Sequence, residues 1–355
     1  MGTIYVSLLL HFYQPPWQYR DVLERIIEEC YAPFVGYVLR YKPPITINAN
    51  YSLFEVLATH KFSDIERRFR EALSCVDVTN SAAYHPLIPL VLQLPNGQLI
   101  IEDQISINRN HLELVGAHVR GFFPPEMAID ERTISIIQEE WFIADSICFD
   151  AVNRPTIPYN YVGTFGKKCA FFRSRHWSNE LTLGMPAKRD FDIEGYVRRL
   201  KDGVSKWFNG EDGYVILAFD GETLGHHVPQ YRNFIEIFFN EAGILGIRII
   251  ALNQLLETFP ERKRVNLAAG SWSTDMKDMD RGIYYPLWLG DNKHHRFWYH
   301  QLRNLADIYS RVDDATKREI LRLTNSCIPW QISAGNMIPF KDWLKKVDGL
   351  LTHNS

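Results

Sequence analysis

The sequence alternates short apolar runs of strand length with longer stretches of helical periodicity. The clearest run, Tyr214–Phe219, leads directly into Asp220. Six similar runs precede it: Ile4–Leu10, Ile45–Ile47, Val76–Val78, a run ending near Gly121, Phe142–Phe149 and Ala170–Arg173. Between the runs, three long stretches have helical periodicity: Leu53–Ala72, Ile105–Leu114 and Phe191–Trp207. Strands joined by helical crossovers pair in parallel, so the pattern predicts an α/β fold whose seven-stranded sheet closes into a barrel.

The pattern changes towards the C-terminus. After about residue 265 no long strand is predicted, and Trp298, Leu302 and Leu305 recur at the spacing of one helix face. We therefore expect two domains, a barrel over residues 1–264 and a helical domain over residues 265–355.

The charges of the chain nearly balance, since 39 Lys and Arg stand against 42 Asp and Glu, a net charge of −3. That balance gives no electrostatic attraction to nucleic acid or to an anionic membrane, so we expect neither as a partner. The 9 Trp and 17 Tyr suit a flat, uncharged, hydroxylated ligand such as a sugar, although most aromatic residues of a large protein fill its core.

The five cysteines are scattered and form no CxxC pair, which argues against a disulfide framework and fits a reducing compartment. The apolar run Ile4–Leu10 lacks a basic flank and is followed by His11 and Gln14-Pro15-Pro16, so it predicts a buried strand rather than a targeting sequence. We expect a cytoplasmic protein.

The stretch Gly121–Asp130 carries one carboxylate, Glu126, directly behind two prolines. Both prolines fix φ and lack an N–H, so the chain around Glu126 is stiff and cannot continue a central strand. Asp130 is a suitable N-cap for a helix with Ile134 on its inner face. A strand end, a rigid acidic corner and a helix start together form the arrangement in which barrel enzymes present a catalytic group.

Polar residues follow six of the seven predicted strands. The carboxyl ends of parallel strands meet at one end of a barrel, so these residues describe one shared mouth. In chain order they are His11 and Gln14, Asn48 and Asn50, Asp77 and His85, Glu126, His176 and Trp177, and Asp220 and Glu222.

Two carboxylates at such a mouth, Glu126 and Asp220, are what glycoside hydrolysis needs: one attacks the anomeric carbon and the other protonates the leaving oxygen. If the last strand persists through Gly221, Glu222 lies on the same side as Asp220 and supplies the like charge that raises its pKa. The alternative is that Glu222 pairs with a nearby Lys or Arg.

Metal chemistry is the competing interpretation. Candidate ligands are present at His11, Asp77, His85, His176, His226 and His227. However, HExxH, HxH and HxxxH spacings are absent, and adjacent histidines such as His226-His227 rarely chelate one ion together. We expect no metal.

Four segments resemble the motifs of glycoside hydrolase family 57, and a fifth does so more weakly. They are Leu8–Pro16, Cys75–Pro86, Phe122–Ala128, Phe219–Gly225 and, more weakly, Gly270–Ser273 with Trp288. Tyr13 stands where the first motif, His-x-His-Gln-Pro, has its second histidine.

The resemblance implies roles for individual residues. Glu126 is implied as the catalytic nucleophile and Asp220 as the general acid/base. The remaining motif residues are implied substrate contacts: His11, Tyr13, Gln14, Asp77, His85, Phe123, Glu222, Trp272 and Trp288. Of the two tryptophans, we favour Trp272 as the wall of a substrate subsite, because its Gly-Ser-Trp-Ser run has no helical periodicity.

The resemblance also implies an incomplete seven-stranded (β/α)7 barrel with a C-terminal helical region closing over the active site. It implies a retaining, cofactor-free enzyme that cleaves α-glucosidic bonds of an α-glucan or maltooligosaccharide, and we favour hydrolysis. The alternatives are a 4-α-glucanotransferase, a catalytically silent α-glucan-binding homologue and, more distantly, a metal-dependent polysaccharide deacetylase.

Overall fold

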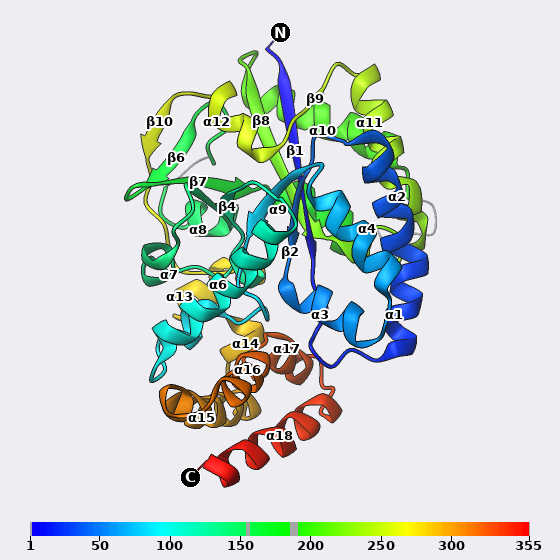
Figure 1. Cartoon of the computed structure of the whole chain (residues 1–355). Coiled ribbons are helices and arrows are strands. Elements are labelled where there is room, and N and C mark those ends of the chain that lie inside the picture. Colours follow the sequence, from blue (N-terminus) through cyan, green and yellow to red (C-terminus); the bar gives the residue numbers. More distant parts are fainter. Residues whose placement is uncertain (1, 154–156, 185–190, 355) are drawn as a thin grey trace.

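A computed structural model describes residues 2–153, 157–184 and 191–354. Its centre is a ring of parallel strands in the order β1-β2-β3-β4-β5-β7-β8, in which β8 pairs again with β1 (Figure 1). This confirms the predicted seven-stranded barrel. The strands are β1 (Ile4–Phe12), β2 (Thr46–Ala49), β3 (Asp77–Asn80), β4 (Val119–Phe122), β5 (Trp141–Asp145), β7 (Lys168–Arg173) and β8 (Gly213–Asp220).

The barrel is closed unevenly. Strand β8 pairs with β1 along its whole length, from Gly213 opposite Ile4 to Asp220 opposite His11. On the other side of β8, β7 pairs only where Arg173 lies opposite Ile216. The Arg173 side chain partly replaces the missing ladder, because its Nε donates to the carbonyl oxygen of Ala218 at 2.7 Å.

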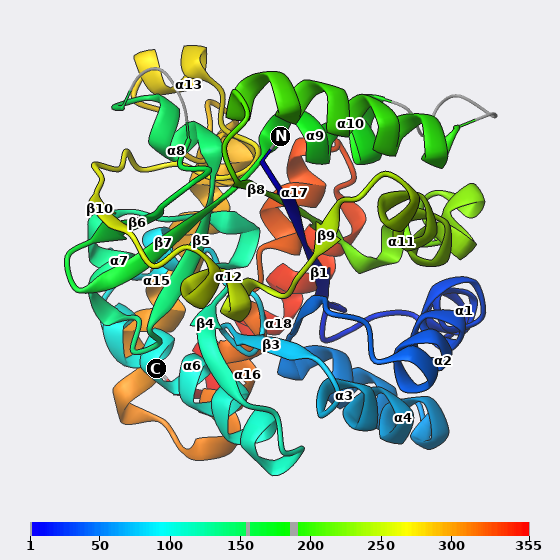
Figure 2. The same cartoon turned by 90° about the horizontal axis from the view of Figure 1, so that it is seen from above.

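Helices surround the strands (Figure 2). Those between barrel strands, or directly after β8, are α1 (Arg20–Ile26), α2 (Ala32–Tyr41), α3 (Tyr51–Thr59), α4 (Ser63–Leu73), α5 (Ile88–Val91), α6 (Gly97–Leu114), α7 (Glu131–Ile136), α8 (Ser146–Asp150), α9 (Arg175–Asn179), α10 (Ile193–Phe208), α11 (Phe234–Ile244) and α12 (Leu252–Thr258). No helix in the described part of the chain is long and apolar enough to cross a membrane.

Two boundaries differ from the prediction. The stretch Leu53–Ala72 is not one helix, because the chain turns between α3 and α4 with Lys61 in the left-handed region at a φ of 63°. The run Phe142–Phe149 is not one strand, because Asp145 ends β5 and caps α8 by accepting a hydrogen bond from the backbone N–H of Ile147. Short polar side chains that capture backbone donors start helices within apolar sequence.

Three short strands extend the sheet and were not predicted. Strand β6 (Val162–Phe165) runs antiparallel to β7, β10 (Arg262–Arg264) pairs with β6, and β9 (Arg248–Ile249) pairs with β1. The sequence of β10 is Arg-Lys-Arg and all three residues are exposed, so this strand carries no apolar signal.

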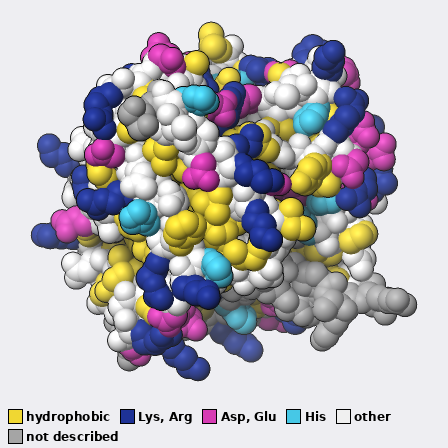
Figure 3. All heavy atoms as spheres, turned by 90° about the horizontal axis from the view of Figure 1, so that it is seen from below, with side chains coloured by type: hydrophobic (Ala, Val, Ile, Leu, Met, Phe, Trp, Pro, Cys, Tyr) yellow, Lys and Arg dark blue, Asp and Glu magenta, His cyan; other side chains and the backbone are white. Residues whose placement is uncertain are grey.

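The C-terminal helices lie across the carboxyl ends of the barrel strands (Figure 1). They share one hydrophobic core with α5 and α6 rather than enclosing a core of their own. Figure 3 shows this end of the molecule, where hydrophobic side chains gather near the centre with Lys and Arg around them. The helices are α13 (Met276–Asp280), α14 (Pro286–Leu289), α15 (Lys293–Ile308), α16 (Asp314–Leu323), α17 (Cys327–Ser333) and α18 (Ile338–Asn354).

The turn after β8 depends on glycine at position 221. A Cβ atom there would lie 2.1 Å from the ring of Phe12, which is buried on β1. We expect Gly221→Ala to lower the free energy of unfolding by about 1–3 kcal/mol, the usual cost of overpacking a core. Urea denaturation measures this change.

Gly243 is the matched control, because it lies in α11 and a Cβ there meets nothing within 4 Å. Gly243→Ala should stabilise the protein, by at most about 1 kcal/mol. Equal effects of the two substitutions would contradict the packing argument.

Candidate active site

The two predicted catalytic carboxyl groups lie at the carboxyl end of the barrel. Asp220 is the last residue of β8, opposite His11 in register. Glu126 lies in a short turn, η2 (Pro125–Met127), which follows β4. Glu126 and Met127 both have positive φ values, 58° and 48°, a conformation that costs about 1–3 kcal/mol for each residue and persists only where the surroundings enforce it.

Hydrogen bonds on both sides enforce this turn. The backbone N–H of Met127 donates to Pro124 at 2.8 Å, and the backbone N–H of Trp272 donates to the Glu126 carbonyl oxygen at 3.2 Å. Asp130 caps α7 as predicted, accepting from the backbone N–H of Thr133 at 2.7 Å. The acidic corner is therefore held by its own prolines and by the segment that precedes the C-terminal helices.

The carboxyl group of Glu126 accepts one hydrogen bond on each oxygen. Trp272 Nε1 donates to Oε2 at 2.8 Å, and Ser326 Oγ lies 2.8 Å from Oε1. The Nδ1 atom of His85 is 3.6 Å from the same Oε1. An ionised carboxyl group only accepts, so two donors on opposite oxygens favour the charged form of Glu126.

Asp220 is placed differently. No group in the described residues hydrogen-bonds its carboxyl oxygens, so they are free to bond a ligand. Burial raises the pKa of Asp220 to about 6, while the positive charge of Arg173 opposes this rise. Burial also raises the pKa of Glu126 to about 7, with the charge of Asp220 adding to the rise and the Ser326 and Trp272 donors opposing it. Between these two values the pair of carboxyl groups therefore holds about one proton.

Arg173 is buried at the end of β7, and each of its three guanidinium nitrogens donates a hydrogen bond. Besides the Ala218 carbonyl, it donates to Asp145 and to Asn179, each at 2.7 Å. Asp145 also receives Arg175 Nε at 2.7 Å, so one buried carboxylate faces two guanidinium groups. This cluster leaves a net positive charge beside Asp220. Neither Arg173 nor Asp145 was predicted as a site residue.

Five rings form a continuous wall beside Glu126. His11 stacks on Phe123 and on His85, with 4.7 Å between ring centroids in both pairs, and His85 stacks on Tyr13 at 4.4 Å. The Trp272 ring meets Phe123 edge-on at 6.1 Å. Burial lowers the pKa of His11 to about 4 and also lowers that of His85, so both imidazoles are neutral near pH 7. The structure thus brings five predicted contact residues together.

Glu222 lies beside this site but has other partners. Strand β8 stops at Asp220 and Gly221–Thr223 form a 3-10 turn, so the condition for Glu222 to share a strand face with Asp220 is not met. Tyr31 donates to Glu222, and Gln14 Nε2 donates at 3.1 Å. Burial raises the pKa of Glu222 to about 8, with the charge of Asp220 adding to the rise, so this carboxyl is mainly neutral at pH 7. Glu222 therefore neither supplies a like charge to Asp220 nor pairs with a Lys or Arg, the two roles that the sequence suggested.

Asp77 lies at the opposite end of the barrel. It opens β3 instead of following it, so the expectation that it lies at the mouth is wrong. Its carboxyl group accepts from Thr46 Oγ1 at 2.8 Å and from the backbone N–H of Asn253 at 3.2 Å, which caps the start of α12. Trp288 is fully buried in the core that the C-terminal helices share with α5 and α6, which leaves it no face for a ligand.

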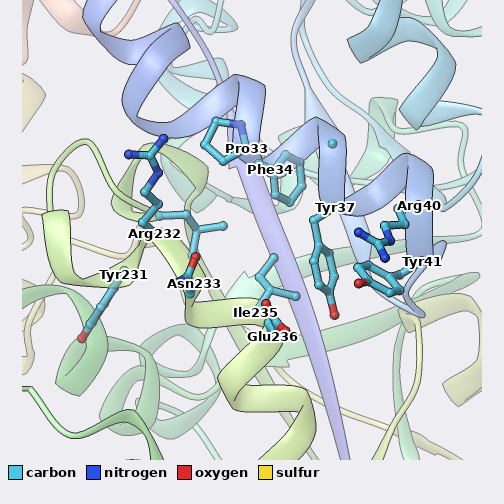
Figure 4. A pocket seen from close by; sticks show the side chains of 12 residues that line it. Pro33, Phe34, Tyr37, Arg40, Tyr41, Tyr231, Arg232, Asn233, Ile235 and Glu236 are labelled. Atoms are coloured by element: carbon cyan, nitrogen blue, oxygen red, sulfur yellow. The ribbon is translucent and has the colours of Figure 1, made fainter.

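Asn48 holds the wall residue His11, whose Nδ1 lies 2.7 Å from Asn48 Oδ1, whereas His176 and His226 contact neighbouring side chains. His176 stacks edge-on against Trp177, and His226 is paired with Glu29. Within the described ranges, no three His, Cys, Asp or Glu side chains are grouped so that they could hold a metal ion. A separate groove of about 270 Å³ between α2 and α11, which Tyr37 and Glu236 help to line, contains none of the predicted site residues (Figure 4).

Two residues of the C-terminal region reach the site without having been predicted. Ser326 bonds Glu126 from 200 positions along the chain. The charges of Glu126 and Asp220 add to burial in raising the pKa of the Cys327 thiol to about 12, which places that thiol near both carboxyl groups. The segment Asn325-Ser326-Cys327 has no motif or periodicity that marks it, so no local signal could have revealed it.

A (β/α)7 barrel with a buried carboxyl pair and an aromatic wall at the carboxyl ends of its strands is typical of a glycoside hydrolase. The family model for glycosyl hydrolase family 57 matches residues 13–268. The chain belongs to glycosyl hydrolase family 57, as the sequence motifs predicted.

Solved structures support the same fold. The branching enzyme from Pyrococcus horikoshii matches with a TM-score of 0.75 at 17% identity, covering 99% of this chain and 88% of that one. The α-amylase from Thermotoga maritima matches at 0.69 and 14%, covering 100% and 94%. The 4-α-glucanotransferase from Thermococcus litoralis matches at 0.65 and 15%, covering 90% and 53%. A search of curated protein sequences finds no match.

The position of Asp77 leads to a prediction. Asp77→Ala removes the acceptor for Thr46 and for the N-terminus of α12, so the free energy of unfolding should fall by about 1–3 kcal/mol. Because Asp77 is at the far end of the barrel, kcat/KM of the folded enzyme should not change. Urea denaturation and initial rates at a temperature below unfolding test the two statements, and a loss of kcat/KM in folded enzyme would return Asp77 to the active site.

Proposed function

We propose that this protein is a retaining glycoside hydrolase that cleaves α-glucosidic bonds of α-glucans. The observation that carries the proposal is the unequal pair of carboxyl groups: Glu126 is held by a donor on each oxygen, whereas Asp220 has no bond in the described residues. The branching enzyme, the α-amylase and the 4-α-glucanotransferase that share the fold support α-glucan as the substrate class.

In the first step, a Glu126 oxygen forms a bond to the anomeric carbon while the glycosidic C–O bond breaks. The departing oxygen takes the proton of Asp220, which leaves a glycosyl ester on Glu126. In the second step, Asp220 removes a proton from water, the water oxygen attacks the anomeric carbon, and the ester bond breaks to restore Glu126. Two inversions at one carbon retain its configuration.

The assignment of roles follows from the hydrogen bonds. Trp272 and Ser326 stabilise negative charge on Glu126, which a nucleophile needs, and a proton on Glu126 would displace one of them. Asp220 is free to donate to a leaving oxygen. Burial raises the pKa of Glu126 further than that of Asp220, to about 7 against about 6, so the productive arrangement of the shared proton depends on these donors and on the bound leaving group.

The aromatic wall suits an α-glucan for a simple physical reason. A glucose ring presents flat C–H faces that stack on aromatic side chains, and hydroxyl groups at its rim that bond to polar atoms. Tyr13 and Trp272 are both only partly buried residues, unlike Phe123 in the same wall. A sugar acceptor in place of water would give glucan transfer by the same second step.

Replacing either carboxyl group tests the pair. Glu126→Gln and Asp220→Asn should each lower kcat by several orders of magnitude on amylose, pullulan or maltooligosaccharides, with an unchanged circular dichroism spectrum. The double variant should be little slower than the worse single variant, because residues that act in one step are not additive. A single variant that keeps about a tenth of the wild-type kcat would exclude its residue from the mechanism. Resolving products by length distinguishes hydrolysis from transfer.

The pH dependence should be bell-shaped. Below the pKa of Glu126 the nucleophile is protonated, and above the pKa of Asp220 the acid has lost its proton. With these pKa values raised to about 7 and about 6, the state with one shared proton is most populated between them, so kcat/KM should be greatest there and fall on both sides. Initial rates across this range measure the profile. A maximum near the usual pKa of an exposed carboxyl group would contradict the burial of the pair.

Trp272 should contribute both a wall and a donor. Trp272→Ala should raise KM for long substrates. It should also raise the pKa of Glu126, which moves the alkaline limb of kcat/KM to higher pH and lowers its maximum, whereas Trp272→Phe keeps a ring and should show mainly this pH effect. Trp330→Ala on α17 is the control, because Trp330 is exposed. If Trp272 were simply core, its loss would cost about 3–5 kcal/mol in unfolding free energy, a fall that thermal denaturation would reveal.

A further inference from the structure

A single hydroxyl group connects the proposed nucleophile to a buried histidine. Ser326 Oγ lies 2.8 Å from Glu126 Oε1 and 2.8 Å from His85 Nδ1. The contact is fixed by backbone as well, because the Ser326 N–H donates to the His85 carbonyl oxygen at 2.9 Å and Pro86 forms a bridge with Asn325. The turn between α16 and α17 therefore docks directly on the loop after β3.

Counting the protons on Ser326, Glu126 and His85 shows which group donates in each of the two hydrogen bonds. A serine hydroxyl has one proton, and an ionised Glu126 can only accept, so Ser326 donates to Glu126. The lone pair of Ser326 must then accept from His85 Nδ1–H. His85 is neutral, because burial and the neighbouring His11 lower its pKa. A neutral imidazole carries one N–H, so the Nε2 atom of His85 has none and is an acceptor.

This acceptor has no partner among the described residues. His85 is 2% exposed and its Nε2 is a buried polar atom without a hydrogen bond. The hydroxyl of Tyr13, whose ring stacks on His85, is also buried and lies beside the Cys327 thiol. Eight buried side-chain polar atoms of the described residues lack a hydrogen-bond partner, and His85 Nε2 is the one that belongs to a ring stacked in the aromatic wall within 4 Å of Glu126 through its other nitrogen. Leaving such a group unsatisfied costs about 1–3 kcal/mol, so its position at the wall of the active site indicates a place for a ligand.

We propose that Ser326 is a positioning residue that keeps Glu126 ionised and fixes His85 in its Nδ1–H form, so that His85 Nε2 accepts a hydrogen bond from a sugar hydroxyl. The substrate part of this inference rests on the proposed function. Through Ser326, the C-terminal region thereby keeps the proposed nucleophile charged and makes His85 Nε2 a hydrogen-bond acceptor for the substrate.

Other groups around Glu126 do not replace this hydroxyl. The titratable groups that influence Glu126 or lie on the same wall are Asp220, Tyr13, Cys327, His11 and His85. Tyr13 and Cys327 have pKa values raised far above neutrality by burial, so neither ionises near pH 7. Ser326 is thus the hydroxyl through which the C-terminal helices act on the nucleophile.

The first test uses the wild-type protein without substrate. In ¹⁵N-histidine NMR above the pH at which Glu126 ionises, with the His85 signals assigned by their loss in His85→Gln, Nδ1 should be protonated and Nε2 unprotonated. A protonated Nε2 would overturn the proposal. This measurement does not depend on glucan activity, so the tautomer is decided separately from the proposed function, which fails if the wild type cleaves no α-glucan.

The second test uses Ser326→Ala, Ser326→Thr and Ser333→Ala. A hydrogen bond to a charged group contributes about 1.5–3 kcal/mol, which equals about 1–2 pH units, so Ser326→Ala should raise the pKa of Glu126 by that amount. Because Glu126 is the second of the two carboxyl groups to ionise, the alkaline limb of kcat/KM should move upward, the maximum of kcat/KM should fall, and KM should rise. Ser326→Thr retains the hydroxyl and should restore the limb. Ser333→Ala is the matched control, since Ser333 is exposed on the same helix and donates to the Leu287 carbonyl oxygen. An unmoved limb in folded Ser326→Ala, or a limb moved equally in Ser333→Ala, would overturn the proposal.

Discussion

The two hydrogen bonds to the Glu126 carboxyl group are the interaction on which the site depends. One donor, Trp272, follows the barrel strands, and the other, Ser326, precedes α17, so the proposed nucleophile is held from both sides of the site. The strained left-handed turn at Glu126 and Met127 persists because these contacts, with the adjoining prolines, leave it no alternative. The C-terminal helices also share a hydrophobic core with α5 and α6. The two parts that contribute to the site are therefore packed against each other.

Burial and nearby charges suit the two carboxyl groups to the proposed reaction. Burial raises the pKa of Glu126 and of Asp220 towards neutrality, and the buried Arg173 limits the rise at Asp220 without a direct hydrogen bond to it. The neutral His11 and His85 add no further charge, which leaves the aromatic wall able to stack on an uncharged ring. One proton, shared by two acids with different hydrogen-bond surroundings, is sufficient for both steps of the proposed reaction.

The sequence predicts the barrel because its strands are apolar on both faces and stand out as continuous runs, as Tyr214–Phe219 does. It predicts the acidic corner because two prolines and the Asp130 cap are local signals. It misplaces Asp77, because the apolar run Val76–Val78 ends two residues before β3 does, so Asp77 opens the strand instead of lying near its carboxyl end. Ser326 is beyond local reasoning altogether, because its role arises from a contact across 200 positions.

The most direct measurement traps the proposed glycosyl ester. A fluorinated α-glucosyl fluoride needs no acid to expel its leaving group, so Asp220→Asn should accept it on Glu126 and then hydrolyse the ester slowly. Mass spectrometry of the digested protein should place the added sugar on the peptide that contains Glu126, with none in Glu126→Gln. A label on another residue, or product of inverted configuration, would contradict Glu126 as the nucleophile. No adduct, together with inactivation by EDTA that zinc reverses, would contradict the carboxylate mechanism as a whole.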